Sequence, residues 1–396
     1  MACLFSGLPV SAQTQETVPV GIAAFNLAWA GTVDDFKRHV EVCSAPEVNW
    51  CDSRIRISRR ARHAAPEEEI RAMECRDATI AAAGGFETMM TIAPCNAYGK
   101  RKNPAAAETV ENYNAKLSGL RATVENLIQN ENVKIIAFQE IKSREVIAHV
   151  LGGFAERFNV CVAPHDAFQT VAFAWDQSIS SSSSVANDCI PNPDLAIASA
   201  RSVRPGLALK LVINGAPVTF LNIHLKSGCA NPKTSKGFVG RKLTDSDSAC
   251  EVLNRQIPVI EEWIENVAKE SPRFVLLGDF NRRIDEEAAA PVAKTEVRTD
   301  GSDPAGPNVK DESGRVKSRY LWQEIADGSP AMHQVPLAST EPGCTGFKGL
   351  DHIVISDPIE KAQTRALSSR KIAVVKERRQ PIATSDHCPR VTILEL

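Results

Sequence analysis

The sequence predicts an α/β protein with two mostly antiparallel sheets and helices on their outer faces. Apolar runs of strand length alternate with segments whose apolar residues recur at helical spacing. Asn214-Gly215 lies between two apolar runs, which is the strongest short-range signal for a β-hairpin. Hairpins within an alternating pattern argue against a simple doubly wound parallel sheet, and the sequence shows no repeat of solenoid period.

The composition is that of an ordinary globular protein. The 396 residues are 43% hydrophobic and 24% charged, with a formal net charge of −2, which is enough material for one large core or two smaller ones. The near-neutral charge argues against coating of nucleic acid by bulk electrostatics, although a local basic groove is compatible with it. No apolar run is long enough to span a bilayer.

The first fifteen residues resemble the later part of a secretory signal. Leu8-Pro9-Val10-Ser11-Ala12 ends in the small residues typical of a cleavage site. The basic part of such a signal is missing, because the first Lys or Arg is Lys37. We therefore expect residues 1–15 to be a signal remnant, with a disordered chain end as the alternative.

The cysteines also favour a secreted or periplasmic protein. Eleven are present, and removal of Cys3 with the signal leaves ten, an even number typical of disulfides in an oxidising compartment. The alternatives are zinc, which the absence of Cys-x2-Cys spacing disfavours, and scattered buried thiols. Spacing does not fix the connectivity, but the near neighbours are Cys43/Cys51, Cys75/Cys95, Cys161/Cys189, Cys229/Cys250 and Cys344/Cys388.

The predicted elements follow one another along the whole chain. A strand over residues 20–27 precedes a charged, cysteine-bearing segment at about 34–104, which we interpret as a disulfide-tied insertion with helical composition over 67–83. A polar stretch rich in Gly and Pro at about 284–318 predicts a long surface loop. The remaining expected helices are 114–129, 145–152, 253–267 and 321–325, and the strands are 133–138, 171–175, 207–213, 218–225, 274–277, 350–355 and 391–394.

Polar residues of the kind used in catalysis gather at the ends of the predicted strands. The strand over 274–277 runs into Gly278-Asp279-Phe280-Asn281, where Asp279 and Asn281 are two residues apart and can point the same way. Taken alone, this tetrapeptide is typical of a tight turn. Because other strand ends carry similar residues, we expect one rim of the core to hold Asn26, Glu140, His224, Asp279, Asn281, Asp351, Asp386 and His387.

Short motifs in the sequence resemble the signature blocks of the endonuclease/exonuclease/phosphatase superfamily, with its deoxyribonuclease-I-like fold. The matching blocks, in order, are Asn26, Gln139-Glu140, His224, Gly278-Asp279-Phe280-Asn281, Leu350-Asp351-His352 and Ser385-Asp386-His387. The resemblance covers about residues 20–396 outside the insertion. It implies a four-layered α-β-β-α sandwich, formed by a single domain over residues 16–396, and a divalent-cation-dependent phosphoesterase.

The resemblance also implies roles for these side chains. Glu140, Asn26 and Asp386 would hold Mg²⁺, or Mn²⁺ or Ca²⁺ in its place, because carboxylate and amide oxygens suit hard cations. Asp279 would deprotonate the attacking water, and Asn281 would position that water or the phosphate. The other groups would contact phosphate oxygens or protonate the leaving group: His387 oriented by Asp351, His224, and with less support Arg204 and Lys226.

One departure from the resembled pattern concerns His224. Nucleases of this type often carry a glutamate partner for this histidine near the strand at Val171, where the present sequence offers only Gln169 or Asp166. The insertion is also unusual. It would either build a wall of the substrate site or only stabilise the fold.

The sequence favours DNA, and as a further possibility RNA, as the substrate. The segments around His224 and Asp351 resemble bacterial extracellular nucleases, and basic clusters could contact backbone phosphates without reading sequence. One alternative is a small-molecule or phospholipid phosphoesterase of the same fold. Another is a non-catalytic binding module, which would be expected to have lost one of the site residues. The basic clusters are Arg54–Arg62, Lys100–Lys102, Lys233–Lys242 and Arg282-Arg283.

Overall fold

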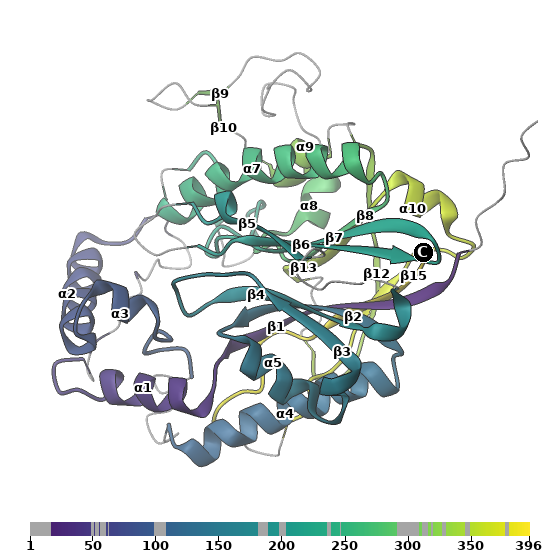
Figure 1. The fold of residues 1–396 in the computed structure, drawn as a ribbon. Helices are drawn as coiled ribbons and strands as arrows, with labels where there is room; N and C mark the ends of the chain where they lie inside the picture. Colours follow the sequence, from purple (N-terminus) through teal and green to yellow (C-terminus); the bar gives the residue numbers. More distant parts are fainter. Residues whose placement is uncertain are drawn as a thin grey trace, which may run out of the picture.

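Two β-sheets pack face to face and carry helices on both outer sides (Figure 1). This arrangement confirms the α-β-β-α sandwich. The structure, a computed structural model, describes residues 17–48, 51, 55, 61, 63–98, 108–180, 189–197, 203–235, 239–245, 247–290, 309–310, 316–317, 320–326, 330–344, 349–376 and 380–396.

Both sheets are mixed and mostly antiparallel. Within the described ranges, the first sheet has seven strands in the order β12-β14-β15-β1-β2-β4-β3, with β1 parallel to β2 and β12 parallel to β14. The second has six strands in the order β11-β13-β8-β7-β6-β5, with β7 parallel to β8. The predicted hairpin at Asn214-Gly215 is confirmed, because it joins β6 to β7.

The strands of the first sheet, in chain order, are β1 (Pro19–Ala30), β2 (Val133–Ile141), β3 (Phe158–Val162), β4 (Thr170–Asp176), β12 (Leu337–Thr340), β14 (Ser369–Lys371) and β15 (Arg390–Glu395). Those of the second are β5 (Cys189–Asn192), β6 (Gly206–Ile213), β7 (Ala216–His224), β8 (Phe274–Asp279), β11 (Met332–Gln334) and β13 (Asp351–Ser356). A separate short pair consists of β9 (Val309–Lys310) and β10 (Val316–Lys317).

Apolar clusters hold the layers together. The inward faces of the two sheets pack through residues such as Ile22, Phe173 and Leu277. A second cluster joins α4 and α5 to the outer face of the first sheet, and a third joins α7, α8 and α9 to the second. The bounds of these helices, and of the further helix α10, are α4 (Val110–Gln129), α5 (Arg144–Leu151), α7 (Ser248–Glu270), α8 (Ile284–Ala288), α9 (Leu321–Ile325) and α10 (Asp357–Ala362).

A buried pair of amides ties the two sheets together close to one end. Gln139 Nε2 of β2 donates to Asn222 Oδ1 of β7 at 2.7 Å. Asn222 Nδ2 in turn donates to backbone carbonyls of β2 and β4 at 3.0 and 2.8 Å. Both side chains are fully buried, so removal of either would leave polar atoms unsatisfied at a cost of about 1–3 kcal/mol. The pair fixes the relative position of Glu140 and His224, which follow on these two strands.

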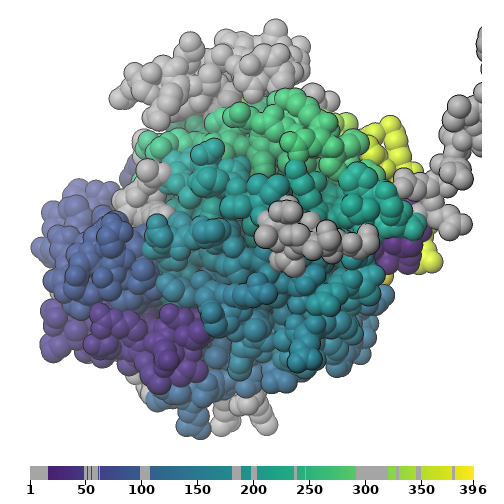
Figure 2. Space-filling model, in the orientation of Figure 1, coloured from purple at the N-terminus to yellow at the C-terminus, as the bar shows by residue number. Residues whose placement is uncertain are grey.

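The cysteine-bearing segment forms a helical lobe at one end of the sandwich. It contains α1 (Val33–Cys43), α2 (Pro66–Ala83) and α3 (Phe86–Met90), which lie on the left in Figures 1 and 2. The lobe rests on the core because Phe36 of α1 stacks on Tyr113 of α4, with ring centroids 4.3 Å apart. Its extent as an insertion over 34–104 stays a prediction.

Three of the five expected disulfides are confirmed, and the two within the lobe are wrong. Cys43 lies at the end of α1 and faces the segment after α3, where His39 Nδ1 is 2.8 Å from the carbonyl of Ala93. Proximity along the chain therefore does not decide pairing in this lobe. The bonds are Cys43–Cys95, Cys51–Cys75, Cys161–Cys189, Cys229–Cys250 and Cys344–Cys388.

Some expected boundaries also differ. The first strand continues to Ala30, and the strand expected over 133–138 continues to Ile141, because register shifts let both pass their polar residues without ending. The expected loop at 284–318 begins instead with α8. The expected signal remnant, most of the Arg54–Arg62 cluster and the Lys100–Lys102 cluster lie outside the described residues. No helix in the described ranges has the length and apolar character needed to cross a membrane.

The Arg282-Arg283 cluster is not the exposed basic surface that we expected. Arg282 is fully buried, and its Nε donates to Glu287 of α8 at 2.5 Å. Its Nη1 donates to backbone carbonyls at 2.6 and 2.8 Å. A buried guanidinium that is paired in this way stabilises the loop after β8 and is not available to backbone phosphates.

Candidate active site

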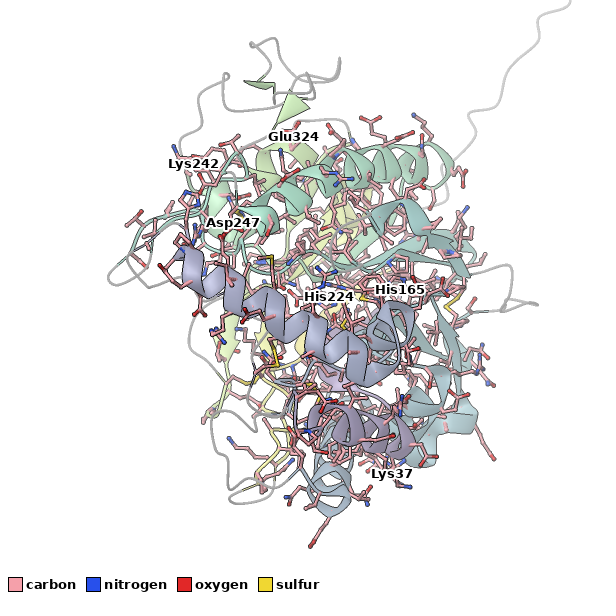
Figure 3. All side chains as sticks on the ribbon, turned by 90° about the vertical axis from the view of Figure 1, so that its left-hand side faces the viewer. Lys37, His165, His224, Lys242, Asp247 and Glu324 are labelled. Atoms are coloured by element: carbon pink, nitrogen blue, oxygen red, sulfur yellow. A yellow bond between two sulfur atoms is a disulfide. The ribbon has the colours of Figure 1, made fainter. Side chains whose placement is uncertain are left out.

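Strand register brings three of the sequence-predicted residues side by side. His224 at the end of β7 pairs with Asp279 at the end of β8, and Asp279 pairs with Asp351 at the start of β13. β8 is therefore the middle strand of the three, which places Asp279 at the centre of the site. All three side chains are at least 95% buried, and His224 is labelled among the interior side chains in Figure 3.

The first sheet brings two further side chains to the same place: Asn26 lies on the face of β1 that carries Ile22 and Ala24, and irregular backbone aims Glu140. Ala28 and Trp29, just after Asn26 on β1, have φ of 51° and 63°, and Glu140 on β2 has φ of 56°. The β1–β2 pairing shifts register between Asn26 and Ala30, and such bulges re-aim side chains near active sites. The Trp29 N–H donates to Glu140 Oε2 at 3.1 Å, which fixes the Glu140 carboxylate.

Asp279 is the most heavily contacted group of the site. Its Oδ2 accepts from Asn26 Nδ2 at 3.1 Å and from Asn281 Nδ2 at 3.2 Å, and its Oδ1 accepts from the Asn281 N–H at 2.8 Å. The two histidines approach the same Oδ2, with Nε2 of His224 at 3.5 Å and Nε2 of His387 at 3.9 Å. Burial raises the pKa of Asp279 from 3.8 to about 7, in spite of the opposing charge of His387. A carboxylate with such a pKa suits a general base near neutral pH.

His387 is oriented by Asp351. Its Nδ1 lies 2.8 Å from Asp351 Oδ2, so its Nε2 faces Asp279. Burial favours the neutral ring, but the carboxylates of Asp351 and Asp279 outweigh it and raise the pKa of His387 well above its ordinary value. Ser385 fixes the loop that carries His387, since its hydroxyl donates to the carbonyl of Asn26 at 2.8 Å and accepts from the His387 N–H at 3.0 Å.

His224 has the opposite electrostatic character. Burial and the nearby guanidinium of Arg204 lower the pKa of His224 well below its ordinary value, so its ring is neutral. Its Nε2 lies 3.6 Å from Glu140 Oε1, while its buried Nδ1 has no partner among the described residues. Neither Gln169 nor Asp166 therefore serves as the missing glutamate partner. One site thus holds a cationic and a neutral imidazole, an arrangement suited to acid–base chemistry.

Arg204 and Lys226 differ in their relation to this cluster. Arg204 is 6% exposed, and burial lowers its pKa to about 10 while Glu140 and Asp279 act in the opposite direction. One of its amino groups donates to the Leu225 carbonyl at 2.5 Å, and its Nε has no partner in the described part of the chain. Lys226 is half-buried and lines the pocket beside the lobe, and its Nζ donates to the carbonyl of Ser227 at 2.8 Å.

Lys116 is a residue of the site that the sequence reasoning missed. It lies on α4 and is 1% exposed. Its Nζ donates to the carbonyl of Leu27, next to Asn26, at 2.9 Å and to that of Thr384, next to Ser385, at 2.5 Å. The ammonium therefore joins the β1 bulge to the His387 loop. The sequence feature that could have identified Lys116 is its position four residues before Leu120, which places a lysine on the apolar face of an amphipathic helix.

The arrangement fits a divalent cation at the predicted ligands. Burial raises the pKa of Glu140 in spite of the opposing charge of His387, and a cation would stabilise the ionised form of such a buried carboxylate. The side chain of Asp386 is exposed. Asn26 contributes an amide oxygen that accepts the Ala28 N–H at 2.9 Å. Hard cations such as Mg²⁺ take oxygens of these types.

A second candidate set of ligands lies deeper. Ligand atoms of Asp279, Asp351 and His387 lie within 4.8 Å of one another. In this set Asp351 and His387 already bond to each other, and Asp279 accepts three hydrogen bonds from amides. Carboxylate oxygens and an imidazole nitrogen are also groups that bind divalent cations.

The fold and the site together define the class: an α-β-β-α sandwich protein with a buried Asp–His cluster where strands of the two sheets meet. No family model and no curated protein matches the sequence. Among solved structures, the chain matches an endonuclease/exonuclease/phosphatase from Bacteroides vulgatus at 14% identity and a TM-score of 0.44, over 76% of this chain and 95% of that chain.

Two further matches are to proteins with quite different names. One is the mannosyl-6-phosphatase Bt3783 of Bacteroides thetaiotaomicron, at 11% identity and a TM-score of 0.41 over 75% of this chain and 95% of that chain. The other is D. rerio TDP2 in complex with a single-strand DNA product, at 10% identity and a TM-score of 0.40 over 71% and 93%. At this level of similarity the matches decide neither activity nor substrate, so the functional argument rests on the site.

Proposed function

We propose that this chain is a divalent-metal-dependent phosphodiesterase that hydrolyses nucleic acid, with DNA as the principal substrate and RNA as a further one. The observation that carries the proposal is the environment of Asp279: a buried carboxylate with a pKa of about 7, held by two asparagines and approached by one neutral and one cationic imidazole. Hydrolysis of a phosphodiester needs a base, an acid and positive charge around the phosphate, and this site offers all three.

In this mechanism Asp279 Oδ2 accepts a proton from the attacking water. Asn281 holds the carboxylate in position through its N–H and side-chain amide. His387, kept protonated by Asp351, donates a hydrogen bond to the phosphate or a proton to the leaving oxygen. His224 and Arg204 supply further donors to the phosphate oxygens. The divalent cation, when bound at Glu140, Asn26 and Asp386, supplies positive charge that stabilises the phosphate in the transition state.

The proposal includes export. Five disulfides, some of them in the lobe and some in the core, are typical of proteins in oxidising compartments. We therefore place the protein in the periplasm or outside the cell.

Nicking of supercoiled plasmid by the purified protein tests the proposal. We expect nicking with Mg²⁺, no nicking with EDTA, and no nicking by Asp279→Ala or His387→Ala. His333→Ala is the matched control, because this histidine is partly exposed and bonds Asp357 away from the site. Intact plasmid under Mg²⁺, Mn²⁺ and Ca²⁺ alike would contradict a nuclease. A parallel panel of RNA, sphingomyelin and inositol phosphates identifies the alternative phosphoesterases.

A further inference from the structure

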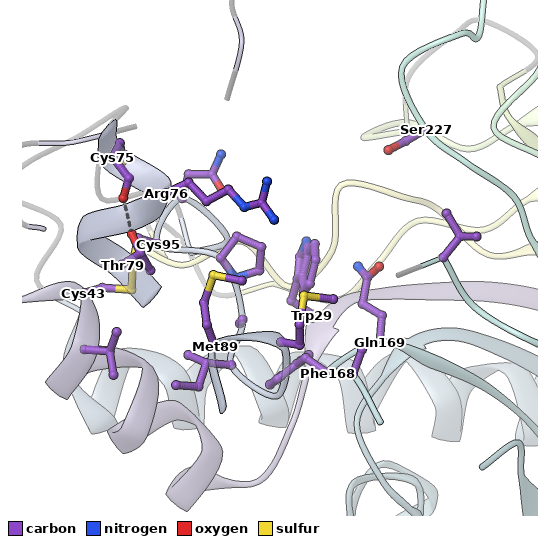
Figure 4. Close-up of a pocket in the computed structure, with 18 of the residues that line it drawn as sticks. Trp29, Cys43, Cys75, Arg76, Thr79, Met89, Cys95, Phe168, Gln169 and Ser227 are labelled. Carbon is purple, nitrogen blue, oxygen red and sulfur yellow. Dashed lines mark hydrogen bonds between the residues drawn. A yellow bond between two sulfur atoms is a disulfide. The ribbon is translucent and has the colours of Figure 1, made fainter. Parts of the chain in front are cut away.

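A pocket of about 180 Å³ lies between the helical lobe and the sandwich (Figure 4). One wall comes from the lobe: α2 supplies Arg76 and Thr79, α3 supplies Met89, and the Cys43–Cys95 disulfide completes the wall. The opposite wall comes from the sandwich, and two of its residues also belong to the site: Trp29 fixes Glu140, and Arg204 faces the acidic cluster. The pocket therefore opens directly beside the place where the phosphate would react.

The floor of the pocket is apolar and suited to a flat ligand. Trp29 and Phe168 lie next to each other with ring centroids 5.9 Å apart, and the thioether of Met89 lies along the same floor (Figure 4). Aromatic faces favour stacking of other planar rings, and methionine adapts its shape to ligands of differing outline. The volume lies below the roughly 300–1,000 Å³ of sites for drug-sized ligands, so one ring system is a better occupant than a long chain.

Two buried donors at this pocket have no partner among the described residues. Gln169 is 7% exposed and its Nε2 is unbonded, and Arg204 is 6% exposed with an unbonded Nε. Figure 4 shows the Gln169 amide beside Trp29 at the open side of the floor. Most buried polar atoms have a hydrogen-bond partner, and a bound molecule can provide the missing one. The rim adds positive charge, because Arg76 extends toward the space from α2 (Figure 4) and Lys226 also lines the pocket.

We propose that this pocket binds the nucleobase of a nucleotide adjoining the scissile phosphate. The inference rests on the proposed nuclease function and adds a subsite to it. A nucleobase combines a planar face for Trp29 and Met89 with a hydrogen-bonding edge for Gln169, while the cations of the rim donate hydrogen bonds to the phosphates of the nucleotide. An isolated phosphate would not use the apolar floor, and an acyl chain would use neither the amide nor the cations. The helical lobe thereby acquires a role as a wall of the substrate site.

The experiment compares two substrates in one assay. The kcat/KM for a single-stranded oligodeoxynucleotide is divided by that for an oligomer of the same length composed of abasic sites. We expect the intact oligomer to be preferred by the native protein, and Gln169→Ala and Met89→Ala each to reduce this preference at least about fivefold, as expected for loss of base contacts. The matched controls are Gln177→Ala and Met73→Ala, whose side chains are exposed away from the pocket, and both keep the native preference.

A binding measurement separates the subsite from the nuclease function. Titration calorimetry compares deoxyadenosine 5′-monophosphate with deoxyribose 5-phosphate on the native protein and on Gln169→Ala. If the native protein binds the nucleotide more tightly than the sugar phosphate, and the variant does not, the subsite is supported even if no oligomer is cleaved. Absence of cleavage would then contradict only the nuclease function. Equal binding of both ligands, or a substrate preference unchanged in Gln169→Ala and Met89→Ala, overturns the subsite whatever the protein cleaves.

Discussion

Asp279→Asn should inactivate the enzyme and at the same time stabilise its fold. A rise in the pKa of Asp279 from 3.8 to about 7 means that the ionised carboxylate is less favourable in the folded protein than in the unfolded chain. At about 1.4 kcal/mol per pH unit, this corresponds to a penalty of up to about 4 kcal/mol above pH 7. The neutral amide does not carry this penalty. Loss of the base should lower kcat roughly 10²–10⁴-fold.

The stabilisation has a defined dependence on pH. Because the pKa of Asp279 is raised in the folded state, its contribution to the free energy of unfolding of the wild type is fully present below about pH 4. This contribution is lost as the pH rises to about 7. The two proteins should therefore be equally stable at pH 4, and the variant should be the more stable one above pH 7. Urea denaturation of both proteins in EDTA between pH 4 and 8.5 measures this difference, in which the titration of groups that do not interact with Asp279 cancels.

Asp176→Asn provides a matched control of opposite sign. Asp176 is also buried, but there the N–H and hydroxyl of Ser178 and the ammonium of Lys134 outweigh burial and lower its pKa. This carboxylate stabilises the folded state at neutral pH, so its replacement should destabilise the protein above pH 4. If Asp279→Asn destabilises the protein at pH 8 as Asp176→Asn does, the reasoning on burial at the site is refuted.

Three other predictions follow from the same contacts. Asp351→Asn removes the carboxylate that keeps His387 protonated, so the alkaline limb of the kcat/KM profile should move to lower pH; an unmoved limb would show that His387 is not the acid. Lys116→Met leaves two buried carbonyls without their donor, so urea denaturation should show a loss of about 2–4 kcal/mol in the free energy of unfolding. The kcat of this variant should also be lower, and a fully stable variant would contradict the proposed link between the loops. Replacing Cys43 and Cys95 by serine opens the lobe beside the pocket; thermal unfolding should show a loss on the order of 2–4 kcal/mol, and unchanged oligonucleotide KM would count against a role of the lobe in substrate binding.

Local patterns predicted the longer strands and helices and suggested the candidate site residues. The strand ending at Asp279 is visible as an apolar run before Gly278, because burial of a whole strand leaves a continuous apolar segment in the sequence. The amphipathic helix α4 is visible from its periodicity. The ordered motifs then indicated that polar residues after such elements share one site. Each of these signals depends on neighbours a few residues apart.

What the sequence could not decide depends on register and packing across the whole chain. The hydrogen bond between Asn26 and Asp279 joins residues 253 positions apart, and it forms because Asn26 lies on the same face of β1 as Ile22 and Ala24, which pack toward the second sheet. The same holds for the Cys43–Cys95 bond, which follows from helix packing and not from spacing.

The sequence by itself determined that the chain folds as two sheets covered by helices and that polar residues stand at the ends of its strands, because periodicity and composition are local properties of the chain. The tertiary structure alone decided that Asp279 is the buried centre of the site, that His387 is cationic and His224 neutral, and that Lys116 joins two loops there. Burial and charge at a site are sums over neighbours brought from distant parts of the chain, and no local segment contains them.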